Sequence, residues 1–126
     1  MSIDACEAIK ELETHGKLRR FTPVGRGPAR RRAYLAFEAQ GDFDSPRSAV
    51  NTLCGQGHIR AALTRWTLGE HVYAAFLKRL KRPPPEIWEI RVTPPNAQAR
   101  LLCRFADPDT LIFTKFHTRE IGRAHV

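Results

Sequence analysis

The sequence predicts an α+β fold: a small antiparallel sheet with a helical pair packed on one face, preceded by a short helix and a basic arm. Three segments with strand-like alternation follow one another near the C-terminus, separated by short connections, which is typical of an antiparallel meander. Apolar residues at helical spacing fill the middle of the chain, and one further strand lies ahead of them. The 126 residues suffice for one core of this size.

Residues 1–32 predict a helix followed by a flexible arm. Between Ile3 and Thr14 apolar side chains recur at three-residue steps, and Gly16 would end that helix. The segment Lys17–Arg32 has seven basic residues, no acidic one, and several prolines and glycines. Because its like charges repel one another, we expect an irregular, exposed arm that adds salt-sensitive affinity for nucleic acid. A solvated leader with no such role is the alternative.

The next residues predict a strand and then a helix. The string RAYLAFEA, residues 32–39, is rich in aromatic and apolar residues and predicts the first strand. A helix is expected over residues 44–55, where Pro46 would occupy the first turn and Gly55 would follow the last.

Two apolar stripes at helical spacing complete the expected helical layer. One comprises Ile59, Ala62, Leu63 and Trp66, and the other comprises Val72, Phe76, Leu77 and Leu80. Gly69 either separates two helices or kinks one long helix. Trp66 and Phe76 are expected in the core and not in a base-stacking platform.

Three strands are expected after the prolines of RPPPE, which cannot continue a helix. They cover residues 86–92, 99–105 and 110–119. Residues 33–120 then form one folded unit. The last six residues, 121–126, read IGRAHV, which is also the translation of a common sequencing-adapter DNA. We therefore expect this tail to have no packing role.

Charge and cysteine content restrict the class of protein. The net charge is +8, which favours a polyanionic partner such as nucleic acid. The three cysteines have no metal-ligand spacing, so neither a disulfide framework nor a metal site is indicated, and no cofactor is expected. Neither a membrane-spanning segment nor a signal peptide is indicated, so we expect a cytoplasmic protein.

Strand alternation sorts the C-terminal side chains onto two faces. The core face is expected to carry Trp88, Ile90, Val92, Leu101, Cys103, Phe105, Ile112, Thr114, Phe116 and Thr118. The other face is expected to carry Ile87, Glu89, Arg91, Arg100, Leu102, Arg104, Leu111, Phe113, Lys115, His117 and Arg119. Basic residues dominate this second face, and a solvated outer face usually mixes signs. The pattern therefore favours an anion-binding surface over a merely solvated one.

His117 is the titratable group of that face. An imidazole can exchange a proton near neutral pH while neighbouring cations hold a phosphate. This combination suits cleavage of RNA, in which the 2′-hydroxyl attacks the adjacent phosphate and negative charge builds on the phosphoryl oxygens.

The order strand, helical pair, then PPPEIWEIRV, ARLLCRF and TLIFTKFHTR resembles the RelE/ParE toxin superfamily, in particular its HigB-like, phage-derived branch. Residues 33–119 carry the resemblance, mainly through Trp88, Glu89, Arg91 and Arg100. It implies a type II toxin that cleaves messenger RNA, often on the ribosome, and that a helix-turn-helix antitoxin neutralises.

The resemblance also implies roles for individual residues. Arg100 and Arg104 would contact the scissile phosphate, His117 would transfer a proton, and the RNA backbone would be positioned by Arg91, Lys115 and Arg119. The alternatives are a ParE-like gyrase inhibitor without nuclease activity, a basic nucleic-acid-binding module and a structural phage protein.

Overall fold

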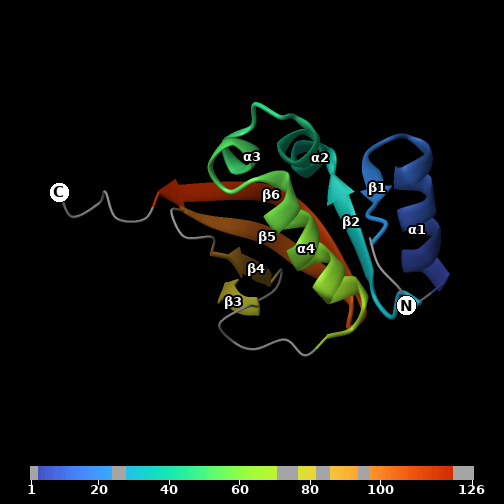
Figure 1. Cartoon of the computed structure of the whole chain (residues 1–126). Helices are drawn as coiled ribbons and strands as arrows, with labels where there is room; N and C mark the ends of the chain where they lie inside the picture. The colour runs from blue at the N-terminus through green and yellow to red at the C-terminus, as the bar shows by residue number, and fades with distance from the viewer. Residues whose placement is uncertain (1–2, 24–27, 71–76, 82–85, 94–96, 121–126) are drawn as a thin grey trace.

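The computed structural model describes residues 3–23, 28–70, 77–81, 86–93 and 97–120. It is an α+β fold built on a six-stranded sheet (Figure 1). In chain order its elements are α1 (Ile3–Thr14), β1 (Leu18–Arg20), β2 (Arg32–Ala36), α2 (Phe37–Asp44), α3 (Ala49–Leu53), α4 (Gln56–Thr67), β3 (Leu77–Lys81), β4 (Ile87–Val92), β5 (Ala97–Asp107) and β6 (Thr110–Glu120).

The strand order in the sheet is β1-β2-β6-β5-β4-β3. The strands β4, β5 and β6 form the expected antiparallel meander, because their short connections bring consecutive strands side by side. The strand β2 pairs in parallel with β6, which the intervening helical layer makes possible. The outer strands β1 and β3 pair antiparallel with β2 and β4.

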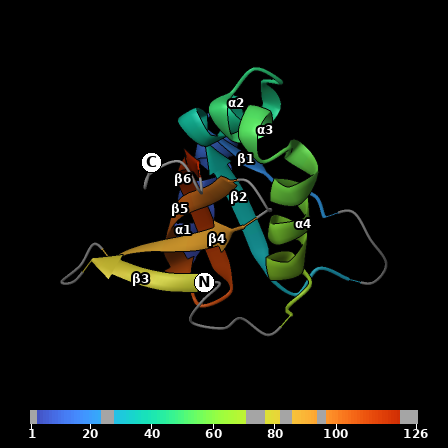
Figure 2. The ribbon, with the colours of Figure 1, turned by 60° about the vertical axis from the view of Figure 1, so that its left-hand side comes forward.

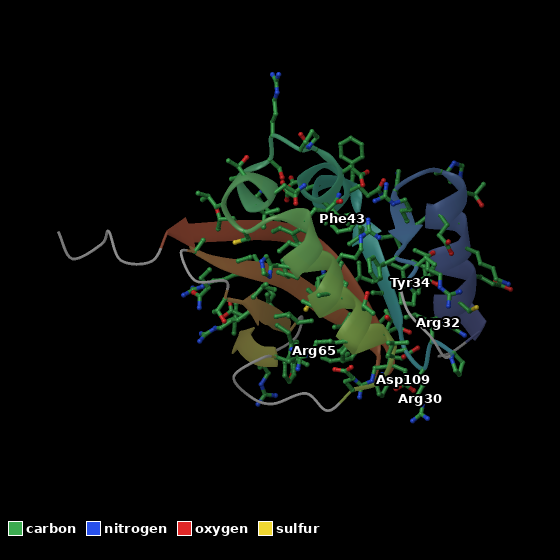
Figure 3. The ribbon with its side chains drawn as sticks, viewed as in Figure 1. Arg30, Arg32, Tyr34, Phe43, Arg65 and Asp109 are labelled. Atoms are coloured by element: carbon green, nitrogen blue, oxygen red, sulfur yellow. The ribbon has the colours of Figure 1, made fainter. Side chains whose placement is uncertain are left out.

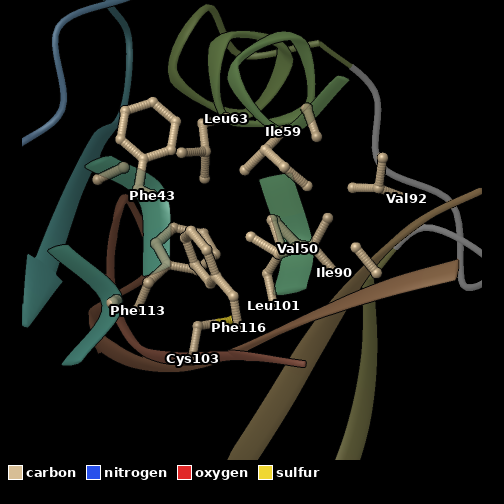
Figure 4. Close-up of a cluster of buried hydrophobic side chains, with 14 of the residues drawn as sticks. Phe43, Val50, Ile59, Leu63, Ile90, Val92, Leu101, Cys103, Phe113 and Phe116 are labelled. Atoms are coloured by element: carbon tan, nitrogen blue, oxygen red, sulfur yellow. The ribbon is translucent and has the colours of Figure 1, made fainter. Parts of the chain in front are cut away.

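The helices α2, α3 and α4 cover one face of the sheet, and α1 lies on the other (Figures 1 and 2). The main core fills the space under α2, α3 and α4 (Figure 4). Its fully buried side chains include Leu35, Val50, Ile59, Leu63, Ile90, Leu101 and Phe113. The core therefore lies on one side of β4, β5 and β6, and their opposite face is available for other contacts.

The predicted stripe of α4 is confirmed. Its apolar members Ile59, Ala62, Leu63 and Trp66 are all buried. The helix ends before Gly69, whose φ of +77° is a conformation that L side chains rarely adopt. Gly69 thus follows the end of α4 and does not kink a longer helix.

The predicted first strand is too long, since β2 ends at Ala36 and Phe37 begins α2. Within α2, Ala39 and Phe43 lie four residues apart and are both buried, so the helical turn places them on the same core-facing side. Phe37, which the predicted strand included, is 77% exposed.

The helix predicted over residues 44–55 is limited to α3, Ala49–Leu53. Pro46 lies before it, and Ser48 is the N-cap, because its hydroxyl accepts a hydrogen bond from the Asn51 amide at 3.2 Å. The Asn51 side chain in turn donates to the carbonyls of Phe43 and Ser45, each at 2.8 Å. These bonds fix the turn between α2 and α3.

The prediction of a second helical stripe is wrong for Leu77 and Leu80, because both belong to strand β3. Leu77 pairs with Ile90 of β4 and packs against the main core, which a strand allows as well as a helix does. The other two members, Val72 and Phe76, lie outside the described residues, as does the tail of residues 121–126.

The prediction of an irregular, exposed arm is wrong for residues 18–21. Leu18 begins β1, and both Leu18 and Phe21 are buried. The guanidinium of Arg19 makes a double hydrogen bond to Asp44 at 2.6 and 2.7 Å and lowers the pKa of that carboxyl group. Arg31 lies over the Trp66 ring at 4.4 Å, a cation–π contact. Arg19 and Arg31 of this segment thus have specific partners in the fold.

Candidate nucleic-acid interface

Three predicted site residues form one row across the sheet face opposite α2, α3 and α4. We call this face the open face. Arg91 of β4 is directly opposite Arg100 of β5, and Arg100 is directly opposite His117 of β6. Directly opposed residues share a face, with Cβ atoms about 5 Å apart. Two cations and an imidazole are therefore neighbours, and we call this set the basic row.

The predicted faces of β6 are wrong before Thr114, because β6 contains a β-bulge. Leu102 pairs with Lys115, but the next residue, Cys103, pairs with Phe113, so Thr114 is the extra residue. The alternation reverses at this point. Leu111 and Phe113, predicted on the basic face, are completely buried in the core.

Ile112, predicted in the core, lies on the opposite face and packs in the α1 cluster. After the bulge the predicted faces hold, because Phe116 is buried and His117 is exposed.

Arg91 is held by a buried carboxylate. Its Nε donates to Oε1 of Glu89 at 2.7 Å, and the Glu89 side chain is only 1% exposed. Both residues lie on β4, two positions apart, and therefore point to the same face. The contact leaves the outer nitrogens of the Arg91 guanidinium without a partner among the described residues.

Arg100 is oriented in a similar way by a neutral group. Its Nε donates to Oε1 of Gln98 at 3.2 Å, again from a residue two positions away on the same strand. Arg104 follows four residues later and is exposed. At the rise of a β-strand this separates the two Cα atoms by about 13 Å. Arg104 therefore belongs to another row, opposite Ile112.

Lys115 is engaged by α2. Its ammonium lies 3.4 Å from Glu38 and 3.9 Å from Asp42. Asp42 also accepts a hydrogen bond from the backbone amide of Phe116 at 3.1 Å. A side chain of α2 therefore provides the acceptor for this amide of β6, beyond the end of β2. The predicted role of Lys115 in holding RNA competes with these two ion pairs.

The remaining predicted residues are His117 and Arg119. The His117 side chain is exposed and has no partner among the described residues. The backbone of Arg119 pairs with Gln98, which puts it one row beyond His117, and its side chain lies outside the described set.

Sequence reasoning missed the groups that hold these cations. Gln98 lies on the predicted face, and the period of two could have found it. Glu38 and Asp42 come from an element predicted as strand and loop, so no local pattern linked them to Lys115. Lys78 of β3 is opposite Glu89, and the expectation of a helix over Leu77 and Leu80 hid that pairing.

Two other kinds of site find no support in the described part of the chain. No group of three or more histidine, cysteine or acidic side chains there could hold a metal ion. Burial raises the pKa of the Cys103 thiol strongly, and the nearby Glu89 adds to the effect, so a thiolate is disfavoured there. No helix among the described elements is long and apolar enough to cross a membrane.

Searches of protein-family models, of curated proteins and of solved structures found no match to the chain. The fold itself defines the class of protein, which is a small α+β protein whose open sheet face is partly basic.

Proposed function

We propose that the chain is an endoribonuclease of the RelE/ParE kind, whose open sheet face binds messenger RNA. The observation that carries this proposal is the basic row of Arg91, Arg100 and His117 across three neighbouring strands. The order of strand, helices and antiparallel meander, on which the resemblance to that superfamily rests, also supports it.

The chemistry follows from the composition of the row. In RNA cleavage the 2′-oxygen forms a bond to phosphorus while the bond to the 5′-oxygen breaks, so one proton leaves the 2′-oxygen and one reaches the 5′-oxygen. We assign this proton transfer to His117, because an imidazole is the side chain that most often acts as a general acid or base. Arg100 and Arg91 stabilise the negative charge that builds on the phosphoryl oxygens, because their guanidinium groups are already oriented before the reaction.

The other cations take lesser roles in this proposal. Arg104 holds another phosphate of the same strand, since its row lies about 13 Å along β5 from Arg100. Lys115 and Arg119 add positive potential at β6, where Glu38 and Asp42 partly neutralise Lys115. From the resemblance we further propose a cytoplasmic toxin that acts on ribosome-bound messages and is neutralised by a helix-turn-helix antitoxin.

A basic RNA-binding module without cleavage is the second candidate. One observation favours it: no described group accepts or donates a hydrogen bond to the His117 ring. A catalytic base is usually oriented by a further group, whereas a passive binding surface needs none.

The deciding experiment measures RNA cleavage by the full-length protein. Purified wild type, His117→Ala and the control His58→Ala are incubated with a messenger RNA, with and without ribosomes, and the new 5′ ends are mapped. His58 is also exposed but lies on α4, on the helical side of the sheet. Loss of a general acid or base costs about 10²- to 10⁴-fold in rate, so His117→Ala should nearly abolish cleavage and His58→Ala should not change it.

Three results would count against the proposal. Equal cleavage by wild type and His117→Ala would remove His117 from the mechanism. RNA binding without any cleavage by the wild type would favour the passive module. Inhibition of gyrase with RNA left intact would favour the ParE-like alternative.

A further inference from the structure

A second basic site lies under α1, on the same sheet face as the basic row. It is a cavity of about 310 Å³ between α1, β1 and β2. Its polar lining consists of Lys10, Glu13, Arg20, Arg32 and Tyr34. Figure 3 shows Tyr34 and Arg32 on the side of β2 that faces α1.

The backbone fixes the two arginines around the tyrosine. Arg20 of β1 is directly opposite Tyr34 of β2, and Arg32 lies two residues before Tyr34 on the same strand. All three side chains therefore share a face. Neither arginine has an ion pair or hydrogen bond from its side chain to any part of the described chain. Two cations that pair with no described acidic side chain thus line one cavity.

Tyr34 adds a hydroxyl group to the lining of the cavity. Its side chain is 5% exposed, and its hydroxyl has no hydrogen-bond partner in the described residues. Burial raises the pKa of Tyr34 and the charge of Glu13 adds to this effect, while Arg20 and Arg32 oppose it. At neutral pH the group is accordingly a phenol, which can donate one hydrogen bond.

The cavity lies on the same sheet face as Arg104 of the proposed RNA surface. Tyr34 pairs with Ile112 of β6, and Ile112 is opposite Arg104 of β5. Two strand spacings separate Tyr34 from Arg104, which is about 10 Å. Arg104 therefore lies between the cavity and the basic row.

We propose that this cavity binds a phosphate group, with Arg20, Arg32 and Lys10 as cations and the Tyr34 hydroxyl as donor. On RNA it holds a backbone phosphate of the strand that crosses the basic row, and this second part rests on the proposed function. A phosphate supplies the acceptor oxygens and negative charge that these donors lack, and arginine binds it in a bidentate geometry. Glu13 opposes the anion and weakens the site.

The first test titrates inorganic phosphate and adenosine monophosphate into the full-length protein by calorimetry. The double variant Arg20→Gln/Arg32→Gln should bind at least about tenfold more weakly, because it loses charged hydrogen bonds. Glu13→Gln should bind several-fold more tightly, a gain that unfolding cannot produce. The control Arg47→Gln removes one positive charge in the exposed connection between α2 and α3 and should stay within twofold of wild type.

The second test compares RNA oligonucleotides of 4 and 12 nucleotides by fluorescence anisotropy. The wild type should gain affinity with length, and the double variant should lose most of that gain. Phosphate binding that is equal in the double variant and in Arg47→Gln would overturn the site. A site that binds phosphate but leaves the RNA length dependence unchanged would overturn its RNA role alone. If the wild type never cleaves RNA but passes both tests, the site stands and the nuclease function fails.

Discussion

Glu89 is the residue on which the orientation of Arg91 depends. It is a carboxylate with 1% exposure on an otherwise basic face, and its partner Arg91 is only 30% exposed. We expect Glu89→Gln to lower the free energy of unfolding by about 1–2 kcal/mol, because a buried charged hydrogen bond becomes a neutral one. The measurement is urea denaturation followed by circular dichroism.

The control for Glu89 is Glu86→Gln. Glu86 pairs with Arg79 at 3.3 Å, but the Glu86 side chain is 36% exposed, against 1% for Glu89. Exposed pairs contribute less, so we expect a change under about 0.5 kcal/mol. Equal losses in the two variants would mean that the Glu89 carboxylate is not an important support for Arg91.

Cysteine reactivity separates the three thiols. Burial raises the pKa of Cys54 and Cys103, and thiol reagents attack the thiolate. Cys6, by contrast, lies partly exposed at the α1 cavity. We expect iodoacetamide to modify Cys6 first in the native protein and all three thiols in denaturant, as measured by mass spectrometry. Native labelling of Cys103 at the rate of Cys6 would contradict the buried position of β5.

At the residue scale, the period of two predicted the row of Arg91, Arg100 and His117, because β4 is regular, β5 is regular up to Phe105 and β6 is regular after Thr114. It failed for Leu111 and Phe113, because one extra residue reverses every side chain on one side of a bulge. Nothing local in the sequence marks that bulge. The residues that hold the cations across elements depend on tertiary contacts and could not be read from one strand.

At the element scale, the meander and α4 were predictable because their apolar patterns are long. The short elements were not. In α2 the residues Ala39 and Phe43 give only one helical repeat, and β3 has leucines whose spacing of three suits a helix. The strand β1 was missed because its basic residues suggested a solvated arm, although Leu18 and Phe21 on either side of them are buried.

Phe21 tests whether the segment after α1 is part of the fold. Its ring is 4% exposed and meets the Phe43 ring edge-on at 6.0 Å between centroids. Removal of a buried phenylalanine side chain leaves a cavity, so Phe21→Ala should cost about 3–5 kcal/mol of stability. Phe37→Ala is the matched control and should change stability by less than about 0.5 kcal/mol, because Phe37 is exposed. Urea denaturation measures both, and similar values would contradict the place of Phe21 in the core.

At the scale of the whole molecule, the described cations differ in whether an acidic group accompanies them. On the helical side, basic residues such as Arg19 and Arg65 are paired with acidic groups. On the open face, Arg20, Arg32 and Arg104 lack such partners within the described ranges. These three cations are therefore available to an extended polyanion that contacts the open face.

The salt dependence of RNA binding tests this distribution. Each phosphate that a cation neutralises on a single strand contributes about 0.7 to the slope of log affinity against log salt, because condensed counterions are released. Arg100→Gln and Arg104→Gln should each lower the slope by about that amount. Arg47→Gln removes the same charge from the exposed connection between α2 and α3, so it should shift affinity slightly and leave the slope unchanged. Binding is measured by fluorescence anisotropy with a 12-nucleotide RNA between 50 and 300 mM KCl, about the range in which such slopes are resolved. Equal slopes for all four proteins would mean that net charge, and not the open face, determines how this chain binds RNA.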